Sequence, residues 1–225
     1  MNDPNKIICL VKFGKQQYLN ELLKKGELYF NHPKRYNEWQ TREKQSGDEH
    51  EGAEWIENAH LTKIQYSHPV IGEGEFKPVK GQLAKIIQYN YFFLSYSLYA
   101  LTTDSFTEND TFRIDPRNAE LKDADSAIFI QEPYKFLRTV TDEIKSRNLQ
   151  YEARLVEYKN MSTEGRTEMN PFTKKWEHEH QNEFRIIIEN VNNKPRTIQI
   201  GSIEEYSHLV SAESMIEMTW TAKRK

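Results

Sequence analysis

The sequence predicts an α+β fold in a single domain over residues 1–225, with central mixed or antiparallel sheets and a few peripheral helices. Short runs rich in β-branched and aromatic residues recur along the chain and outnumber the helical patterns. No repeat, low-complexity tract or clean linker divides the 225 residues, and that length suits one large domain.

The opening segment predicts a strand, a helix and a second strand. Residues 7–13 (IICLVKF) form a nearly continuous apolar run, which is typical of a buried strand. Residues 15–25 repeat their apolar positions at helical spacing, and Gly26 is placed to end that helix. Residues 27–30 (ELYF) predict the second strand, which ends in a polar loop.

The middle and the C-terminal half predict further short strands around one long helix. The clustered charges of Asp48, Glu49 and Glu51 favour a solvent-exposed loop, or a loop that gates a ligand site. Next are expected a strand at 55–66, a loop at 67–80, a helix or strand at 83–91 and a buried strand at 91–101. The later elements are expected as strands at 127–131, 152–158, 197–200 and 216–220, a helix at 133–147, a loop at 161–173 and a hairpin turn at 192–193.

Residues 174–190 (KKWEHEHQNEFRIIIEN) hold the most informative pattern. A strand alternates its faces. The face expected in the core carries Phe184, Ile186 and Ile188, and the opposite face carries Gln181, Glu183, Arg185 and Ile187. Burying charge without a partner is costly, so the polar row predicts either a structural Glu183–Arg185 ion pair or a functional cleft.

Composition and motifs exclude several classes of protein. The formal net charge of -3 gives no overall preference for a polyanion. Cys9 is the only cysteine, so neither an intrachain disulfide nor a Cys/His zinc site is expected. The N-terminus is no signal peptide and no apolar run could span a membrane, so we expect a cytoplasmic protein without a membrane partner. No G-x-G-x-x-G, Walker, H-E-x-x-H or G-x-S-x-G motif is present.

Several short motifs together resemble an uncharacterised bacterial family whose members end in W-x-x-E-x-E-[YF]-R. The closing motif is represented here by Trp176 and by Glu183-Phe184-Arg185. The other matching residues are Tyr29-Phe30-Asn31-His32-Pro33, Asn37, Asp48, Glu51, Leu94-Ser95-Tyr96-Ser97, Val156-Glu157-Tyr158 and Lys174 or Lys175. The resemblance covers most of the chain.

Three segments also resemble, in chain order, the motifs of ADP-ribosyltransferases. Those enzymes carry a His or Arg at the end of the first strand, a hydroxyl or Tyr motif on a middle strand, and a late strand that opens with a catalytic Glu. The corresponding residues here are Lys12, Ser95-Tyr96-Ser97 and Gln181-Asn182-Glu183. Lys12 departs from that pattern, because Lys has neither the planar fork of Arg nor the ring of His.

The second resemblance implies an ADP-ribosyltransferase-like fold, NAD as the cofactor and a role for each matching residue. Glu183 would be catalytic by stabilising the oxocarbenium-like ribose that forms as nicotinamide leaves, and Gln181 would orient the acceptor. The residues implied to bind the cofactor are Lys12, Ser95, Tyr96 and Ser97.

Three functions remain open on the sequence. The first is an ADP-ribosyltransferase-like enzyme of bacterial or phage conflict, such as a toxin, acting on an acceptor that the sequence does not identify. The second is a non-catalytic sensor of a defence or counter-defence system that binds a nucleotide-type molecule or a protein, and Lys12 favours it. The third is a metal-dependent nuclease with Asp48, Glu51 and Glu183 as ligands, since magnesium prefers clustered carboxylates.

Overall fold

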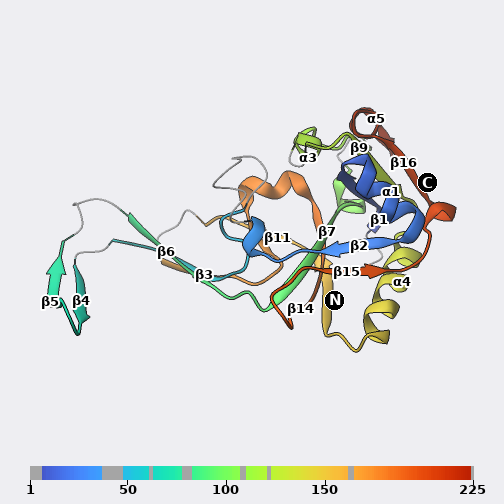
Figure 1. The fold of residues 1–225 in the computed structure, drawn as a ribbon. Helices are drawn as coiled ribbons and strands as arrows, with labels where there is room; N and C mark the ends of the chain where they lie inside the picture. Colours follow the sequence, from blue (N-terminus) through green and yellow to red (C-terminus); the bar gives the residue numbers. More distant parts are fainter. Residues whose placement is uncertain are drawn as a thin grey trace.

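Segments from both ends of the chain meet in one six-stranded antiparallel sheet, around which the molecule is built (Figure 1). The computed structural model describes residues 7–36, 48–60, 63–77, 83–106, 110–120, 123–161 and 165–223. The α+β class, with mostly antiparallel sheets and few helices, is confirmed.

The strands of the described residues are short, with few exceptions. Those of the N-terminal half are β1 (Ile7–Gly14), β2 (Glu27–Phe30), β3 (Ala53–His60), β4 (Ile64–His68), β5 (Gly72–Phe76), β6 (Leu83–Tyr89), β7 (Phe93–Thr102) and β8 (Thr111–Phe112). Those of the C-terminal half are β9 (Ser126–Ile130), β10 (Tyr151–Leu155), β11 (Glu157–Lys159), β12 (Gly165–Glu168), β13 (Thr173–Lys175), β14 (Glu183–Glu189), β15 (Arg196–Gln199), β16 (Ser207–Ser211) and β17 (Trp220–Thr221).

The helices lie at the periphery, as the sequence predicts. The α-helices are α1 (Gln16–Lys25), α3 (Arg117–Glu120), α4 (Pro133–Ser146) and α5 (Ala212–Glu217). Single 3₁₀ turns or short 3₁₀ helices are η2 (Thr103–Ser105), η3 (Trp176–Gln181) and η4 (Glu204–Tyr206). No helix of the described residues is long and apolar enough to cross a membrane.

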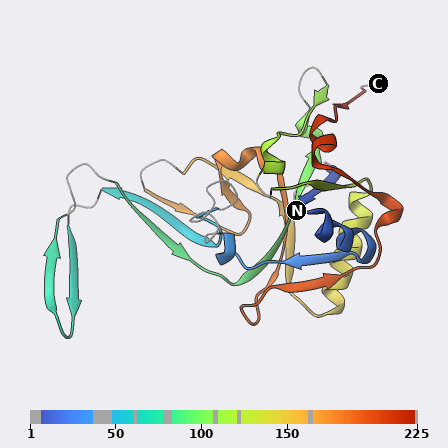
Figure 2. The ribbon, with the colours of Figure 1, turned by 45° about the horizontal axis from the view of Figure 1, so that its top comes forward.

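The central sheet has the strand order β10-β14-β7-β1-β9-β16, and every neighbouring pair is antiparallel. Helices α1 and α4 pack on one face, where Leu22 and Phe136 join the larger apolar cluster. Ile114 and Met215, from the segments around α3 and α5, join the cluster on the opposite face. Figure 2 shows these two groups of helices on different sides of the sheet.

The opening unit forms as its residue pattern predicts. Strand β1 is buried because its apolar side chains reach both faces of a central strand: Leu10 packs on one side and Val11 on the other. Helix α1 buries Leu19 and Leu22 and ends at Gly26, which has a left-handed backbone with φ of 62°. A residue with a Cβ is strained in that conformation, so Gly26 fixes the turn into β2.

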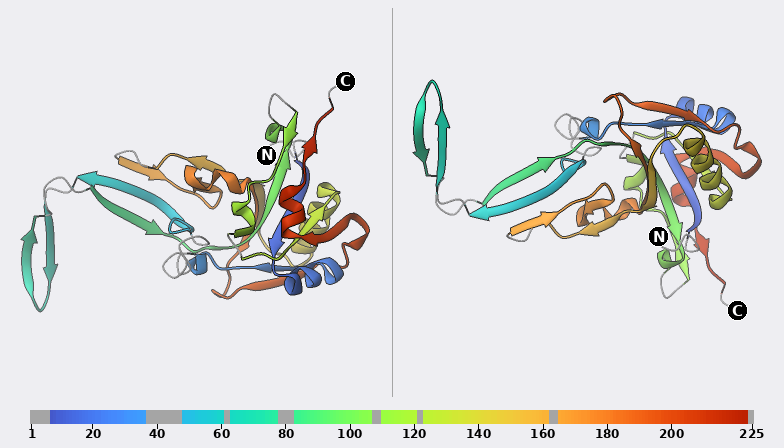
Figure 3. Two further views of the ribbon diagram at one scale, coloured as in Figure 1. Left: turned by 90° about the horizontal axis from the view of Figure 1, so that it is seen from above. Right: turned by 90° about the horizontal axis from the view of Figure 1, so that it is seen from below.

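An arm extends from the central sheet and was not predicted. Strands β12, β3 and β6 form a three-stranded antiparallel sheet, and β4 pairs with β5 in a separate hairpin. Figure 3 shows the hairpin at the far end of this arm, away from the helices. The polar loops expected at 67–80 and 161–173 are therefore wrong in part, because they contain β5 and β12.

Three other expectations on local structure are wrong. The strand expected at 152–158 is interrupted at Val156, which lies between β10 and β11. The backbone nitrogen of Val156 donates a hydrogen bond to the carbonyl oxygen of Glu183. Residues 192–193 do not close a hairpin, because β15 pairs with β2 and not with β14. Most of 216–220 lies in or next to α5, whose start is capped by the hydroxyl of Ser211.

Candidate functional site

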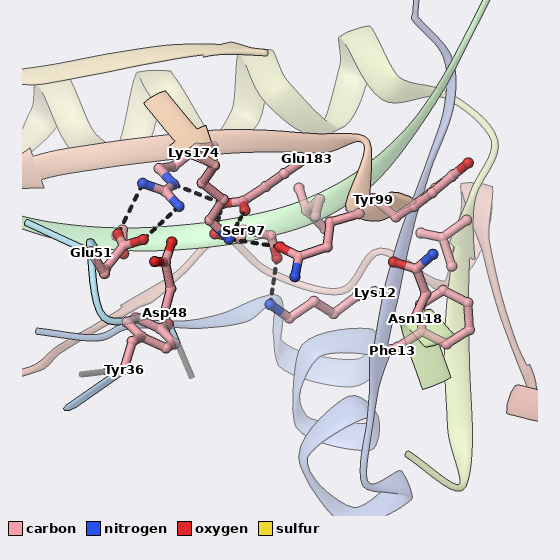
Figure 4. Close-up of a pocket in the computed structure, with 15 residues that line it drawn as sticks. Lys12, Phe13, Tyr36, Asp48, Glu51, Ser97, Tyr99, Asn118, Lys174 and Glu183 are labelled. Carbon is pink, nitrogen blue, oxygen red and sulfur yellow. Dashed lines mark hydrogen bonds and ion pairs between the residues drawn. The ribbon is translucent and has the colours of Figure 1, made fainter. Parts of the chain in front are cut away.

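A polar pocket opens beside β1, β7 and β14, and the motif residues gather there (Figure 4). Its lining combines Val11, Lys12, Phe13, Tyr36, Asp48, Glu51, Ser95, Ser97, Leu98, Tyr99, Asn118, Lys174, Gln181, Glu183 and Arg185. The cavity volume is about 110 Å³. The residues Lys12, Ser95, Ser97, Gln181 and Glu183, selected from three separate motifs, therefore line one pocket.

Strand alternation explains how β7 and β14 present polar side chains to this pocket. In the antiparallel register Arg185 lies opposite Ser97, and Ile187 lies opposite Ser95. The intervening side chains, such as Ile186 opposite Tyr96, belong to the apolar cluster on the other face. The two faces predicted for the late strand are confirmed for Glu183, Arg185, Phe184, Ile186 and Ile188.

Arg185 is the centre of a buried ion network. Its Nε lies 2.7 Å from Oε1 of Glu183, while Nη1 and Nη2 lie 2.9 Å from the two carboxylate oxygens of Glu51. Nη1 also donates to the carbonyl oxygen of Pro171. Arg185 is 2% exposed, and its planar guanidinium suits two carboxylates at once.

Glu183 has partners for both carboxylate oxygens. Besides Arg185, Oε1 accepts a hydrogen bond from the hydroxyl of Ser97, and Oε2 lies 2.6 Å from Nζ of Lys174. Burial alone would raise the pKa of Glu183, but the positive charges of Arg185 and Lys174 outweigh it and hold that pKa well below its ordinary value. Glu183 is therefore an ionised carboxylate at neutral pH, fixed by three side chains.

Glu51 differs from Glu183 although both bind Arg185. Burial raises the pKa of Glu51, and the attraction of Arg185 offsets that effect only in part. Glu51 is 4% exposed, and the neighbouring Asp48 is 5% exposed. The expectation of a solvent-exposed acidic loop is wrong for these two residues. Burial of Glu51 depends on its ion pair with Arg185, which lies far away in sequence.

Lys12 and Gln181 approach the network from opposite ends of the chain. Nζ of Lys12 donates to the carbonyl oxygen of Ser97 at 2.5 Å and lies 4.2 Å from the ring centroid of Tyr96. Gln181 ends η3 and accepts a hydrogen bond from Nζ of Lys174 at 2.7 Å. Gln181 thus reaches the pocket from a 3₁₀ helix and not from the strand itself.

Tyr96 is the implied cofactor-binding residue that does not line the pocket, although its ring contacts Nζ of Lys12. It is 5% exposed, and its side chain lies in the apolar cluster on the other face of β7, where its ring contacts Phe30. Neighbouring residues of a strand point to opposite faces, so Tyr96 cannot share a face with Ser95 and Ser97. Its hydroxyl has no hydrogen-bond partner among the described residues.

Some lining residues were not selected from the sequence. Lys174 carried a signal, since it precedes the polar row in the closing motif, but nothing there distinguished it from Lys175. Asn118, from α3, and Tyr99, from β7, show no local pattern that points to a pocket. Figure 4 shows Asn118 and Phe13 at one end of the pocket and Glu51 and Asp48 at the other.

The carboxylates do not form a metal site within the described part of the chain. No three His, Cys, Asp or Glu side chains there are placed to hold an ion. The guanidinium of Arg185 lies between Glu51 and Glu183, where a cation shared by those carboxylates would have to lie. The geometry therefore gives no support to a nuclease with Asp48, Glu51 and Glu183 as ligands.

Comparisons with known proteins found no significant match: no protein-family model, no curated protein and no solved structure matches the chain.

Proposed function

We propose that the pocket binds NAD and that the protein is an ADP-ribosyltransferase-like enzyme of bacterial or phage conflict. One observation carries the proposal. Lys12, Ser95 and Glu183, which match three motifs in the chain order of that class, line the same pocket together with Gln181. A convergence of this kind, with an ionised buried carboxylate at its centre, is the arrangement that charge stabilisation in a transition state requires.

The chemistry assigns a task to each residue. The bond between ribose C1′ and the nicotinamide nitrogen breaks, nicotinamide leaves with the bonding electrons, and positive charge develops on the ribose. The negative charge of Glu183 would stabilise that ribose, and the acceptor nucleophile would then form the new bond to C1′ and release its proton to water. Gln181 orients the acceptor, whereas Lys12 binds a ribose hydroxyl or a phosphate. Ser97 donates its hydroxyl to Glu183, so it positions the carboxylate.

The size of the pocket limits which part of NAD it encloses. Sites that surround a whole drug-sized ligand have volumes of about 300–1,000 Å³. The cavity here is about 110 Å³, which suits one sugar ring and excludes a complete dinucleotide. On this proposal the nicotinamide ribose enters the pocket, and the remainder of NAD lies outside it.

The test is transfer of label from NAD to protein or nucleic-acid acceptors by the wild-type chain and by Glu183→Gln. Gln keeps the size of the side chain and an acceptor oxygen for Arg185, and a thermal melt checks that the variant folds. We expect label transfer to fall by about 100-fold or more, the scale on which removal of one stabilising group acts. Glu179→Gln, on the exposed side of η3, is the matched control and should transfer label as the wild type does.

A second candidate is a binding module that senses a nucleotide without turning it over. Its support is that both oxygens of Glu183 already have side-chain partners, so a ribose would have to compete with Lys174 for that carboxylate. Label transfer that survives Glu183→Gln removes this residue from the mechanism. Saturable NAD binding without nicotinamide release identifies the sensor, and no binding of NAD at all contradicts the transferase proposal.

A further inference from the structure

We propose that Asp48 is the carboxylate that contacts the sugar, through the ribose hydroxyls of an ADP-ribosyl ligand, while Glu183 acts on the same sugar by charge alone. The proposal rests on the proposed function, because the sugar is that of NAD or its product. It assigns a ligand contact to a residue that none of the three transferase motifs includes.

The three acidic side chains of the pocket differ in how many acceptor oxygens remain available. Both oxygens of Glu183 are engaged by Arg185, Ser97 and Lys174, and both oxygens of Glu51 face Arg185. Asp48 uses only Oδ1, which accepts a hydrogen bond from the backbone nitrogen of His50 at 2.9 Å. No described residue hydrogen-bonds to Oδ2 of Asp48. Asp48 is 5% exposed and lines the pocket, so this oxygen is available only to something inside it.

The backbone around Asp48 holds that carboxylate in place. The backbone nitrogen of Glu51 donates to the carbonyl oxygen of Asp48 at 3.1 Å, which closes a turn. The hydrogen bond from His50 to Oδ1 fixes the side chain within the same turn, as Asp commonly does. Gly52 continues the turn with φ of 78°, and the ring of Tyr91 lies so close that a Cβ there would be 2.8 Å from it. The available oxygen is therefore oriented before any ligand arrives.

Ser95 supplies a second polar group to the pocket. Its backbone is held by two hydrogen bonds of 2.9 Å with Asn31. The residue is 1% exposed and lines the pocket, and none of the hydrogen bonds found among the described residues involves its hydroxyl. Asp48 and Ser95 therefore present two polar groups to one pocket, where a ligand can form hydrogen bonds with both.

The chemistry of the two groups selects a sugar. A carboxylate accepts hydrogen bonds from hydroxyl groups and repels phosphate, while a serine hydroxyl both donates and accepts. A pair of neighbouring ribose hydroxyls matches these requirements, and a cavity of about 110 Å³ suits one such ring. The phosphates of the ligand are then expected away from Asp48.

The test is calorimetric titration of the full chain with ADP-ribose and, separately, with ADP, which lacks the terminal ribose. We expect the wild type to bind ADP-ribose more tightly than ADP. Asp48→Asn should weaken ADP-ribose binding tenfold or more and leave ADP binding unchanged, because a charge-assisted hydrogen bond to the sugar is lost. Asp142→Asn, at an exposed site on α4, is the matched control and should bind both ligands as the wild type does.

The outcomes separate this inference from the proposed function. ADP-ribose binding that is unchanged in Asp48→Asn overturns the inference, whereas label transfer that depends on Glu183 would still support the transferase. A wild type that binds neither ADP-ribose nor NAD overturns both. If Asp48→Asn does not fold, Ser95→Ala replaces it, because this substitution removes only a hydroxyl that lines the pocket. Equal ADP-ribose affinity in Ser95→Ala and wild type then contradicts the sugar contact.

Discussion

Replacing Arg185 by Met removes the one cation that lies between two buried carboxylates, so it tests whether the network holds the pocket together. Glu51 and Glu183 are 4% and 5% exposed and would lose the guanidinium that contacts both. Breaking a buried ion pair by removing one partner costs about 3–5 kcal/mol, because a charge is left buried without compensation. For a chain of this size, the expected fall in melting temperature is about 6–20 °C.

An exposed ion pair in the same chain provides the control. Arg166 and Glu168 on β12 are also two residues apart on one strand, and their Nε and Oε1 atoms are also 2.7 Å apart. Their side chains are 50% and 70% exposed, so that pair is worth about 0–1 kcal/mol. The ring of Trp55 beneath Arg166 adds about 0.5–1 kcal/mol. Arg166→Met should therefore cost much less than Arg185→Met in urea denaturation.

The pH dependence of the same variant has a definite sign. In the wild type, the lowered pKa of Glu183 stabilises the fold above the unfolded Glu pKa of about 4.3, and that contribution is lost as pH falls through the folded pKa. The raised pKa of Glu51 acts in the opposite direction. Without Arg185, the pKa of both carboxyls rises, and that of Glu51 rises most because Lys174 still contacts Glu183. Protonation should therefore favour the fold of the variant as pH falls from 8 toward about 5.

Unfolding free energies at pH 8 and at pH 5 measure this effect. We expect the difference between the wild type and Arg185→Met to shrink at the lower pH. A cost below 1 kcal/mol at pH 8, equal to that of Arg166→Met, would refute the claim that the network is structural. If the difference in unfolding free energy between the wild type and Arg185→Met grows as the pH falls, the charges assigned to Glu51, Glu183 and Arg185 are wrong.

Three further predictions concern the stability of the fold and the accessibility of its interior. Tyr158→Phe removes the hydroxyl that accepts a hydrogen bond from the backbone nitrogen of Glu183 at 2.9 Å. Urea denaturation should show a fall in the unfolding free energy of about 1–3 kcal/mol. An unchanged unfolding free energy would contradict a stabilising role for this hydrogen bond. Gly26→Ala should lower the melting temperature clearly more than Gly72→Ala does. A Cβ at Gly26 overlaps the carbonyl oxygen of Gly201 and the side chain of Ile200, whereas a Cβ at Gly72 meets nothing within 4 Å. Equal melting temperatures of the two variants would contradict this. Burial raises the pKa of the Cys9 thiol to about 12. A thiol reagent at pH 8 should therefore modify Cys9 only after urea unfolds the chain. Rapid labelling of the native protein would show instead that the thiol is accessible.

The sequence predicted those parts of the molecule that depend on local periodicity. The two faces of β14 follow from strand alternation alone, which predicts Phe184 and Ile186 in the core and Glu183 and Arg185 on the polar face, as the structure has them. Strand β1 and helix α1 were predicted for the same reason, because their apolar residues repeat at one period.

The parts that were missed depend on contacts between distant residues. The segment with Asp48 and Glu51 looks exposed when considered alone, and becomes buried because Arg185, 134 positions away from Glu51, neutralises it. Strand β5 was not expected, because its glycines and glutamates disfavour strands, but it pairs along β4 and packs Gly74 against the ring of Tyr66. Asn118 joins the pocket through hydrogen bonds to the carbonyl oxygens of Asp115 and His180, which no sequence motif indicates.

On our proposal the pocket holds the ribose of an ADP-ribosyl ligand between the carboxylate of Asp48 and the hydroxyl of Ser95. A crystal structure of the protein with ADP-ribose tests it most directly. We expect the terminal ribose inside the pocket, with a hydroxyl within hydrogen-bond distance of Oδ2 of Asp48 and the network around Arg185 unchanged. A ligand bound elsewhere, or one whose phosphates contact Asp48, would contradict it.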